Sequence, residues 1–308
     1  MSSRAAVVHL VRHANGPEPL DAFLSSYERH DAGCDHDLVL LCKGFPDREA
    51  LAPVRRRARD HAPHEVVIPD TGLDLTAYFA AARELPHDRL CFVNSYSEVL
   101  APRWLDMLCG ALDQARVGAA AASGSWASRR SFAFSLLRLP NGYRGTLGDR
   151  RRMTPALRSV STAPKVTLAR RLVRAALALP GEITAYPGFP APHLRTNAFA
   201  IGRELMLSLR VGAIDTKPAT YRLEAGRGSL TAQLRERGLQ SLVVDRDGVA
   251  RAPAEWPDVD VFWQGEQSRL LVADNQTRQY EAGAPAVREA LARYAWGPRA
   301  RPSGGTVG

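Results

Sequence analysis

Short apolar runs alternate with segments of helical spacing along the first hundred residues. The runs are rich in aliphatic and β-branched residues, which favour strands, and they predict four of them, at 7–11, 37–42, 65–68 and 89–93. Helical spacing between the runs predicts helices at 19–29, 49–61, 73–84 and 102–115, the last with Pro102 in its first turn. Strands alternating with helices predict a mostly parallel sheet that is covered on both faces.

The second half of the chain continues the pattern after an interruption. We expect a strand and then a helix over 197–209, a helix over 228–237, a strand over 242–244 and a final helix near 284–294. These elements predict one α/β domain over 1–296 with an insertion at 129–180. The remaining residues, 297–308, are rich in Gly, Pro, Arg and Ser, and we expect a disordered tail there.

Composition narrows the class of protein. Of the 308 residues, 45% are hydrophobic and 24% are charged, which is typical of a globular protein with a sizeable core. No run of about 18 apolar residues predicts a membrane span, and the first residues do not resemble a signal peptide. The four cysteines form no Cys-x-x-Cys pair, so we expect free buried thiols in a reducing cytoplasm, rather than a disulfide or a zinc site.

The excess positive charge is concentrated in the predicted insertion. The chain carries +9, whereas residues 129–174 hold twelve basic residues and one acidic residue, a net +11 that leaves −2 for the rest. Within it, 167–179 has one apolar and one basic face. It fits either an ordinary surface helix or a helix on an anionic membrane. Nucleic acid is the least favoured partner, because the segment lacks interleaved aromatic residues for stacking.

The fourth predicted strand runs into the polar turn Asn94-Ser95-Tyr96, followed by Pro102 and Trp104. This arrangement resembles the metal-binding turn of nucleotide-sugar glycosyltransferases of the GT-A fold, family two. In that family an Asp-x-Asp turn holds a divalent cation against the donor's diphosphate. Neutral side chains bind Mg²⁺ or Mn²⁺ poorly, so either Glu98 or the pair Asp70 and Asp74 supplies the charge, or the enzyme works without metal. An ordinary strand-to-helix connection would explain the same turn.

A second block, from His193 to Leu205, resembles the acceptor-side strand and helix of these transferases. In inverting members a Glu-Asp pair opens a later helix, and Glu224 matches its first residue while Ala225 replaces the second. The resemblance implies that Glu224 is the catalytic base and that His193, Arg195 and Arg227 bind the acceptor. The alternative is that Glu224 only stabilises a helix N-terminus.

The resemblance also implies a donor site in the loops after the predicted strands. It places Arg12, Lys43, Asp70, Asp74, Asn94 and Ser95 around the nucleotide. Lys43 would lie beside phosphate, and Asp70 and Asp74 would hold ribose or base edges. Asp70-Thr71-Gly72 is also an ordinary turn sequence.

Together these features predict a Rossmann-like GT-A domain that transfers a sugar from a nucleotide-diphosphate donor to a saccharide or lipid-linked acceptor, with inversion, in cell-surface polysaccharide or glycoconjugate synthesis. The insertion at 129–180 would contact the acceptor or a membrane, or act as a lid, in a cytoplasmic or membrane-associated protein.

Two alternatives stay open. Arg12-His13 resembles the start of the histidine phosphatase and phosphoglycerate mutase family, although Ala14 replaces its Gly. The second alternative is a domain that binds sugar nucleotides without catalysing a reaction.

Overall fold

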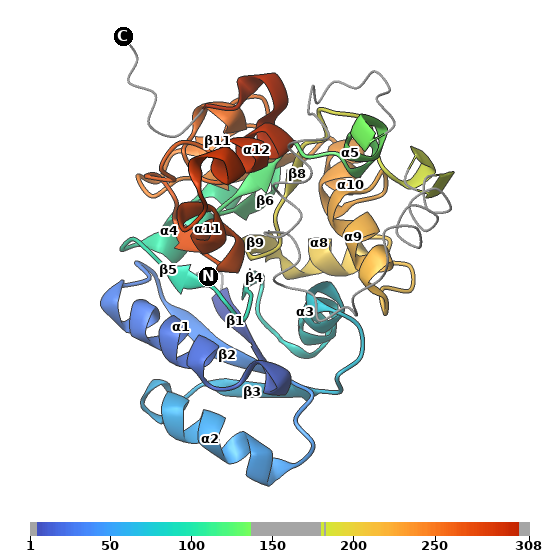
Figure 1. Ribbon diagram of the computed structural model, residues 1–308. Helices are drawn as coiled ribbons and strands as arrows, with labels where there is room; N and C mark the ends of the chain where they lie inside the picture. The colour runs from blue at the N-terminus through green and yellow to red at the C-terminus, as the bar shows by residue number, and fades with distance from the viewer. Residues whose placement is uncertain (1–4, 137–179, 182, 302–308) are drawn as a thin grey trace.

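The computed structural model describes residues 5–136, 180–181 and 183–301 (Figure 1). Most of the predicted basic insertion and the last seven residues lie outside this range. Its main strands are β1 (Ala5–Arg12), β2 (His36–Lys43), β3 (His64–Ile68), β4 (Arg89–Val93), β6 (Val117–Ala121), β9 (Ala198–Gly202), β10 (Gln240–Val244) and β11 (Ala250–Arg251). Two small pairs join β5 (Glu98–Val99) to β12 (Val272–Ala273), and β7 (Gly124–Ser125) to β8 (His193–Leu194).

Helices connect and cover these strands. The α-helices are α1 (Glu18–Arg29), α2 (Arg48–Ala58), α3 (Asp74–Glu84), α4 (Trp104–Leu112), α5 (Arg129–Leu136), α8 (Arg203–Ser208), α9 (Lys217–Ala225), α10 (Leu230–Glu236), α11 (Asn275–Glu281) and α12 (Pro285–Trp296). Short 3-10 helices occupy His13–Asn15, Arg59–His61, Trp256–Asp258 and Gly297–Arg299. None of the described helices is long and apolar enough to cross a membrane.

The eight main strands form one sheet in the order β11-β10-β6-β9-β4-β1-β2-β3. Strands β1, β2, β3 and β4 are parallel, as are β6 and β10, whereas β9 runs antiparallel between β4 and β6. This helix-flanked, mostly parallel sheet confirms the predicted α/β class. Its parallel strands end at one edge, called the carboxyl edge below.

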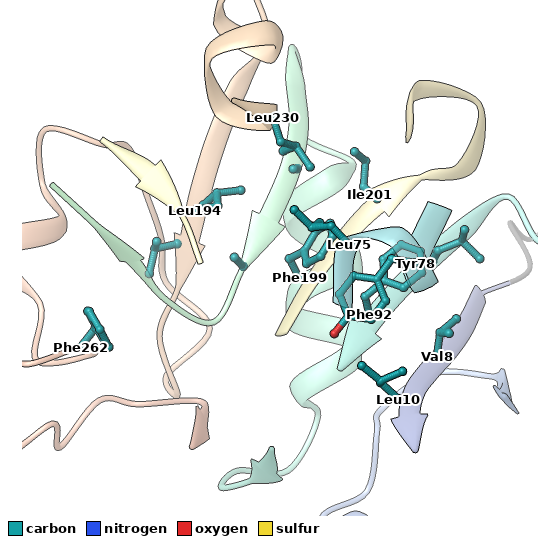
Figure 2. Packing of buried hydrophobic residues seen from close by; sticks show 14 of the residues in the cluster. Val8, Leu10, Leu75, Tyr78, Phe92, Leu194, Phe199, Ile201, Leu230 and Phe262 are labelled. Atoms are coloured by element: carbon teal, nitrogen blue, oxygen red, sulfur yellow. The ribbon is translucent and has the colours of Figure 1, made fainter. Parts of the chain in front are cut away.

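The sheet separates two apolar cores. In β1, Ala6, Val8 and Leu10 pack on the side of α3, and the alternate residues pack on the side of α1, α2 and α4. Figure 2 shows Tyr78 of α3 lying against Phe92 and Phe199, with ring centroids 4.6 and 6.1 Å away. Burial on both faces explains why the strands have nearly continuous apolar sequences.

Strand β6 and helix α9 were not predicted from the sequence pattern. Strand β6 reads Val-Gly-Ala-Ala-Ala, which lacks the branched residues of a typical strand. Packing selects small residues there, because a Cβ at Gly118 would approach Leu234 of α10 to 2.8 Å. The sequence pattern did not predict helix α9 either. Helix α4 begins at Trp104, so Pro102 lies two residues before the helix and not in its first turn.

The predicted disorder from residue 297 is wrong for residues 297–301. Gly297–Arg299 forms a 3-10 helix, Arg299 pairs with Asp258 at 2.5 Å, and Arg301 pairs with Asp260 at 2.5 Å. The buried Gln264 also donates to the Arg299 carbonyl at 3.0 Å and accepts from the Arg301 N–H at 2.8 Å, so the composition of this segment alone wrongly suggested flexibility. The four cysteines are free thiols, three of them buried and Cys34 half-buried.

Candidate active site

The polar side chains predicted for the donor site meet where β1, β2 and β3 end. Arg12 is the last residue of β1 and Lys43 the last of β2, and the two are register partners. Asp70 follows β3 by two residues, and Asp74 begins α3. Ligands of open α/β sheets bind at the carboxyl ends of the strands, which makes this edge the place to look for a site.

Asp70 lies between two cations. Its Oδ1 is 3.1 Å from Nη2 of Arg12 and 3.6 Å from Nζ of Lys43. The hydrogen bond from Arg12 is the main cause that lowers the pKa of Asp70. Lys43 is buried and donates to the carbonyl oxygen of Gly72 at 2.5 Å, and burial lowers its pKa. The structure therefore commits Lys43 to the loop after β3, while Arg12 keeps partial exposure.

Asp74 connects this group to the second half of the site. The side chain is half-buried at the start of α3, and desolvation raises its pKa. The charges of Arg12 and Lys43 oppose that shift, whereas the charge of Glu224 adds to it. Asp74 and Glu224 thus repel each other across a partly desolvated space, a situation typical of functional carboxylates.

Glu224 lies in the last turn of α9, so the expectation that it opens a helix is wrong. Its Oε1 accepts hydrogen bonds from Oγ1 of Thr196 at 3.1 Å and from the Thr196 N–H at 3.4 Å. A carboxylate in that position is opposed by the helix dipole, which at an exposed helix end costs about 0.3–1 kcal/mol. Stabilisation of a helix N-terminus therefore does not explain Glu224.

Thr196 belongs to a segment, 193–197, that crosses the carboxyl edge. Its backbone is held at Leu194, which donates to Thr231 Oγ1 at 2.9 Å, and at Arg195, which donates to the Ser123 carbonyl at 3.1 Å. His193 is buried in β8, its Nδ1 is 2.8 Å from the Ala191 carbonyl oxygen, and burial lowers its pKa. These bonds fix the segment against β6, α9 and α10.

Arg195 is buried rather than open to solvent. Its Nη2 lies 2.5 Å from Oδ2 of Asp274, its Nη1 donates to Ser123 Oγ at 3.1 Å, and its guanidinium stands 3.9 Å from the centre of the Phe262 ring. Arg227, in contrast, is exposed and donates from Nε to the Thr184 carbonyl at 3.1 Å. The three residues predicted to bind the acceptor are thus a buried histidine, a buried arginine paired with Asp274, and an exposed arginine.

The turn after β4 does not fit a divalent cation. Oδ1 of Asn94 accepts from the N–H of Tyr96 at 3.0 Å and from Ser97 Oγ at 2.9 Å, and Ser95 Oγ donates to the Leu10 carbonyl at 2.7 Å. Glu98 is paired with Arg278 at 2.7 Å. The described residues contain no group of three His, Cys, Asp or Glu side chains arranged to hold a metal. The side-chain oxygens of Asn94, Ser95 and Glu98 have partners within the protein, so this turn alone does not supply a ligand set for Mg²⁺ or Mn²⁺.

Sequence reasoning missed Ser123 and gave no role to Asn197 or Asp274. Ser123 follows the unpredicted strand β6, and Asp274 caps α11 through a reciprocal capping box with Thr277. The polar run Asp274-Asn275-Gln276-Thr277 was visible in the sequence. Only the fold shows that it meets Arg195.

The alternative function depends on His13, the residue that follows Arg12. His13 lies exposed in the 3-10 helix after β1, with its ring 5.1 Å from the ring of Phe45. His193, the only histidine in the sequence after His87, lies in β8 with its Nδ1 near the Ala191 carbonyl oxygen.

No protein-family model and no curated protein sequence matches this chain. Among solved structures it is similar to a mannosyltransferase from Pyrobaculum calidifontis in complex with GDP-Man and Mn²⁺, at 15% identity over 83% of this chain and 60% of that chain, with a TM-score of 0.43. It is also similar to glucosyl-3-phosphoglycerate synthase from Mycobacterium tuberculosis with Mn²⁺ and UDP, at 14% identity over 66% and 58%, with a TM-score of 0.34.

A CMP:2-keto-3-deoxy-manno-octonic acid synthetase complexed with CTP also matches, at 10% identity over 78% of this chain and 88% of that chain, with a TM-score of 0.38. The chain spans less than two thirds of the length of the mannosyltransferase and of the glucosyl-3-phosphoglycerate synthase. Because the TM-scores lie below 0.5, we base neither the fold nor the function on these similarities.

Proposed function

We propose that this protein is a glycosyltransferase that uses a nucleotide-diphosphate sugar and takes the acceptor proton with Glu224. The observation that carries the proposal is the position of Glu224: a half-buried carboxylate at the carboxyl edge, held by Thr196 and opposed by the dipole of its own helix. A group kept where local structure disfavours it is a candidate for chemistry rather than for stability.

The proposed reaction is a single displacement with inversion. The acceptor hydroxyl gives its proton to Glu224 while its oxygen attacks the anomeric carbon. The bond between that carbon and the diphosphate breaks, and the nucleoside diphosphate leaves with the electron pair. Arg12, which is 27% exposed, supplies positive charge at the strand ends where the leaving group would lie.

Two features support the proposed acceptor: the positive charge of residues 129–174 and the resemblance to nucleotide-sugar glycosyltransferases. Residues 129–174 carry +11, and only those up to Leu136 belong to the described part of the chain. An anionic or lipid-linked saccharide would complement that charge. Among the described residues, we assign the exposed Arg227 to the same acceptor.

The first experiment identifies the donor and then removes the base. Thermal-shift measurements with UDP-, GDP-, dTDP- and CDP-sugars, with and without Mn²⁺, reveal a bound donor because ligand binding stabilises the folded state. Glu224→Gln retains the oxygen that accepts from Thr196 but cannot take a proton. We expect transfer to fall by about 10²- to 10⁴-fold, with donor binding unchanged.

Glu204→Gln is the matched control, since Glu204 is an exposed glutamate on α8. Equal transfer by Glu224→Gln and wild type would show that the assignment of the base is wrong. Donor binding without transfer or hydrolysis in the wild type would instead identify a sugar-nucleotide-binding protein.

A further inference from the structure

The two asparagines at the end of β4 and the start of β9 are joined through their backbones. The N–H of Asn94 donates to the carbonyl of Asn197 at 2.8 Å. The side-chain oxygen of Asn94 already accepts two hydrogen bonds, one of them from the backbone N–H of Tyr96, which can only donate. This orients the amide and leaves its Nδ2 as the group available to a ligand.

The amide of Asn197 is oriented by a relay of three other buried side chains. Asp274 holds Arg195, and Arg195 donates to Ser123 Oγ at 3.1 Å. Because a guanidinium only donates, Ser123 accepts there and its own proton goes to Asn197 Oδ1, at 3.0 Å. With Oδ1 accepting from Ser123, Nδ2 of Asn197 is the end of the amide without a partner among the described residues.

That nitrogen has no hydrogen-bond partner among the described residues, although Asn197 is only 4% exposed. A buried donor without a partner costs about 1–3 kcal/mol. The buried ion pair and the Ser123 hydroxyl hold the donor in that orientation, and an acceptor atom of a ligand would remove this cost.

We propose that the amide nitrogens of Asn197 and Asn94 bind the donor's diphosphate directly, so that nucleotide binding needs no divalent cation. The identity of the anion rests on the proposed function, whereas the pair of donors does not. Two N–H donors have the opposite polarity to a pair of carboxylates: they bind an anionic oxygen and repel a cation. Arg12 adds a positive charge from the neighbouring strand β1.

Calorimetric titration with UDP, GDP and inorganic pyrophosphate, in EDTA and in Mn²⁺, tests the proposal. We expect the wild type to bind at least one probe with the same Kd in both buffers. Asn197→Asp keeps the oxygen that accepts from Ser123 and replaces the donor with a carboxylate oxygen. We expect its Kd in EDTA to rise by about 10- to 100-fold.

Asn94→Asp, at a half-buried position that keeps the acceptor for Tyr96, is the second variant should Asn197→Asp fold poorly, and we expect a weakening of about tenfold. Gln240→Glu, an exposed change of the same charge at the opposite edge of the sheet, is the control.

Three results would overturn the proposal: tenfold tighter binding of the wild type in Mn²⁺ than in EDTA, binding by both variants equal to that of the wild type, or no binding of any probe. The second of these would mean that water satisfies the amide. Pyrophosphate binding that is weakened by Asn197→Asp, in a protein without sugar transfer, would support the amide site and reject the glycosyltransferase.

Discussion

Two arginine–aspartate pairs stand at the carboxyl edge, and they differ mainly in burial. In the pair Arg12–Asp70 the side chains are 27% and 50% exposed, and the closest atoms are 3.1 Å apart. In the pair Arg195–Asp274 they are 8% and 1% exposed, and the distance is 2.5 Å. The first pair joins β1 to the loop after β3, and the second joins segment 193–197 to α11.

The difference in burial gives the pairs different roles. Water screens the exposed pair, so it contributes little stability. The buried pair cannot open without leaving a charge in a desolvated place. It therefore fixes the segment that carries Thr196 and Asn197, whose side chains hold Glu224 and the free amide.

The largest effect on stability is expected from Asp274→Asn. The substitution leaves Arg195 buried without its counter-ion, which should lower the free energy of unfolding by about 3–5 kcal/mol. Urea denaturation measures the change. Asp258→Asn, which removes the partner of Arg299 at a 60% exposed side chain, is the control with an expected loss below about 1 kcal/mol. Equal losses in the two variants would contradict the comparison.

Asp74→Asn tests the carboxylate that connects the two halves. Its pKa is raised by desolvation, so the folded state holds the proton more tightly than the unfolded state. The charged form therefore destabilises the fold at neutral pH, and this penalty disappears below the unfolded pKa near 3.8. We expect the variant to have a higher Tm than wild type at pH 7 and the same Tm near pH 3.

Asp215→Asn, at an exposed position, is the control for this pH dependence. A lower Tm of Asp74→Asn at pH 7 would mean that attraction to Arg12 and Lys43 outweighs desolvation.

The smallest effect is expected from Asp70→Asn, about 0–1 kcal/mol at pH 7. The pKa of Asp70 is lowered in the fold, chiefly by Arg12. Its contribution is thus present above the unfolded pKa and is lost as the pH falls through the lower folded pKa. Chemical denaturation at pH 7 and pH 3 measures the difference, with the exposed Asp35→Asn as control. A loss of about 3 kcal/mol in the free energy of unfolding at pH 7 would show that this pair stabilises the fold as much as the buried pair does.

Much of the fold could be predicted from local pattern. The apolar runs gave β1 to β4 to within two residues at each end, because strands covered on both faces need continuous apolar sequence. Strand β6 could not be found that way, since its alanines and glycine are selected by the close approach of α10. The tail at 297–301 contacts Asp258, Asp260 and the buried Gln264, which lie 35 to 41 residues earlier.

The candidate site was predicted in part. Arg12, Lys43, Asp70 and Asp74 do lie at neighbouring strand ends, as their positions after apolar runs imply. The sequence also picked out Glu224, but it placed the residue at the wrong end of a helix, because α9 has little apolar periodicity. Their roles in binding and transfer stay predictions.

The sequence by itself determined the order of strands and helices and the kinds of side chain at the strand ends, because these follow from spacing along the chain. Only the tertiary structure decided which of those side chains are free. Asp274 pairs with Arg195 across 79 residues, and only the fold shows that this arginine, which we expected to bind an acceptor, is buried and also donates to Ser123. Burial sets the strength of each pair, and burial depends on how distant segments pack.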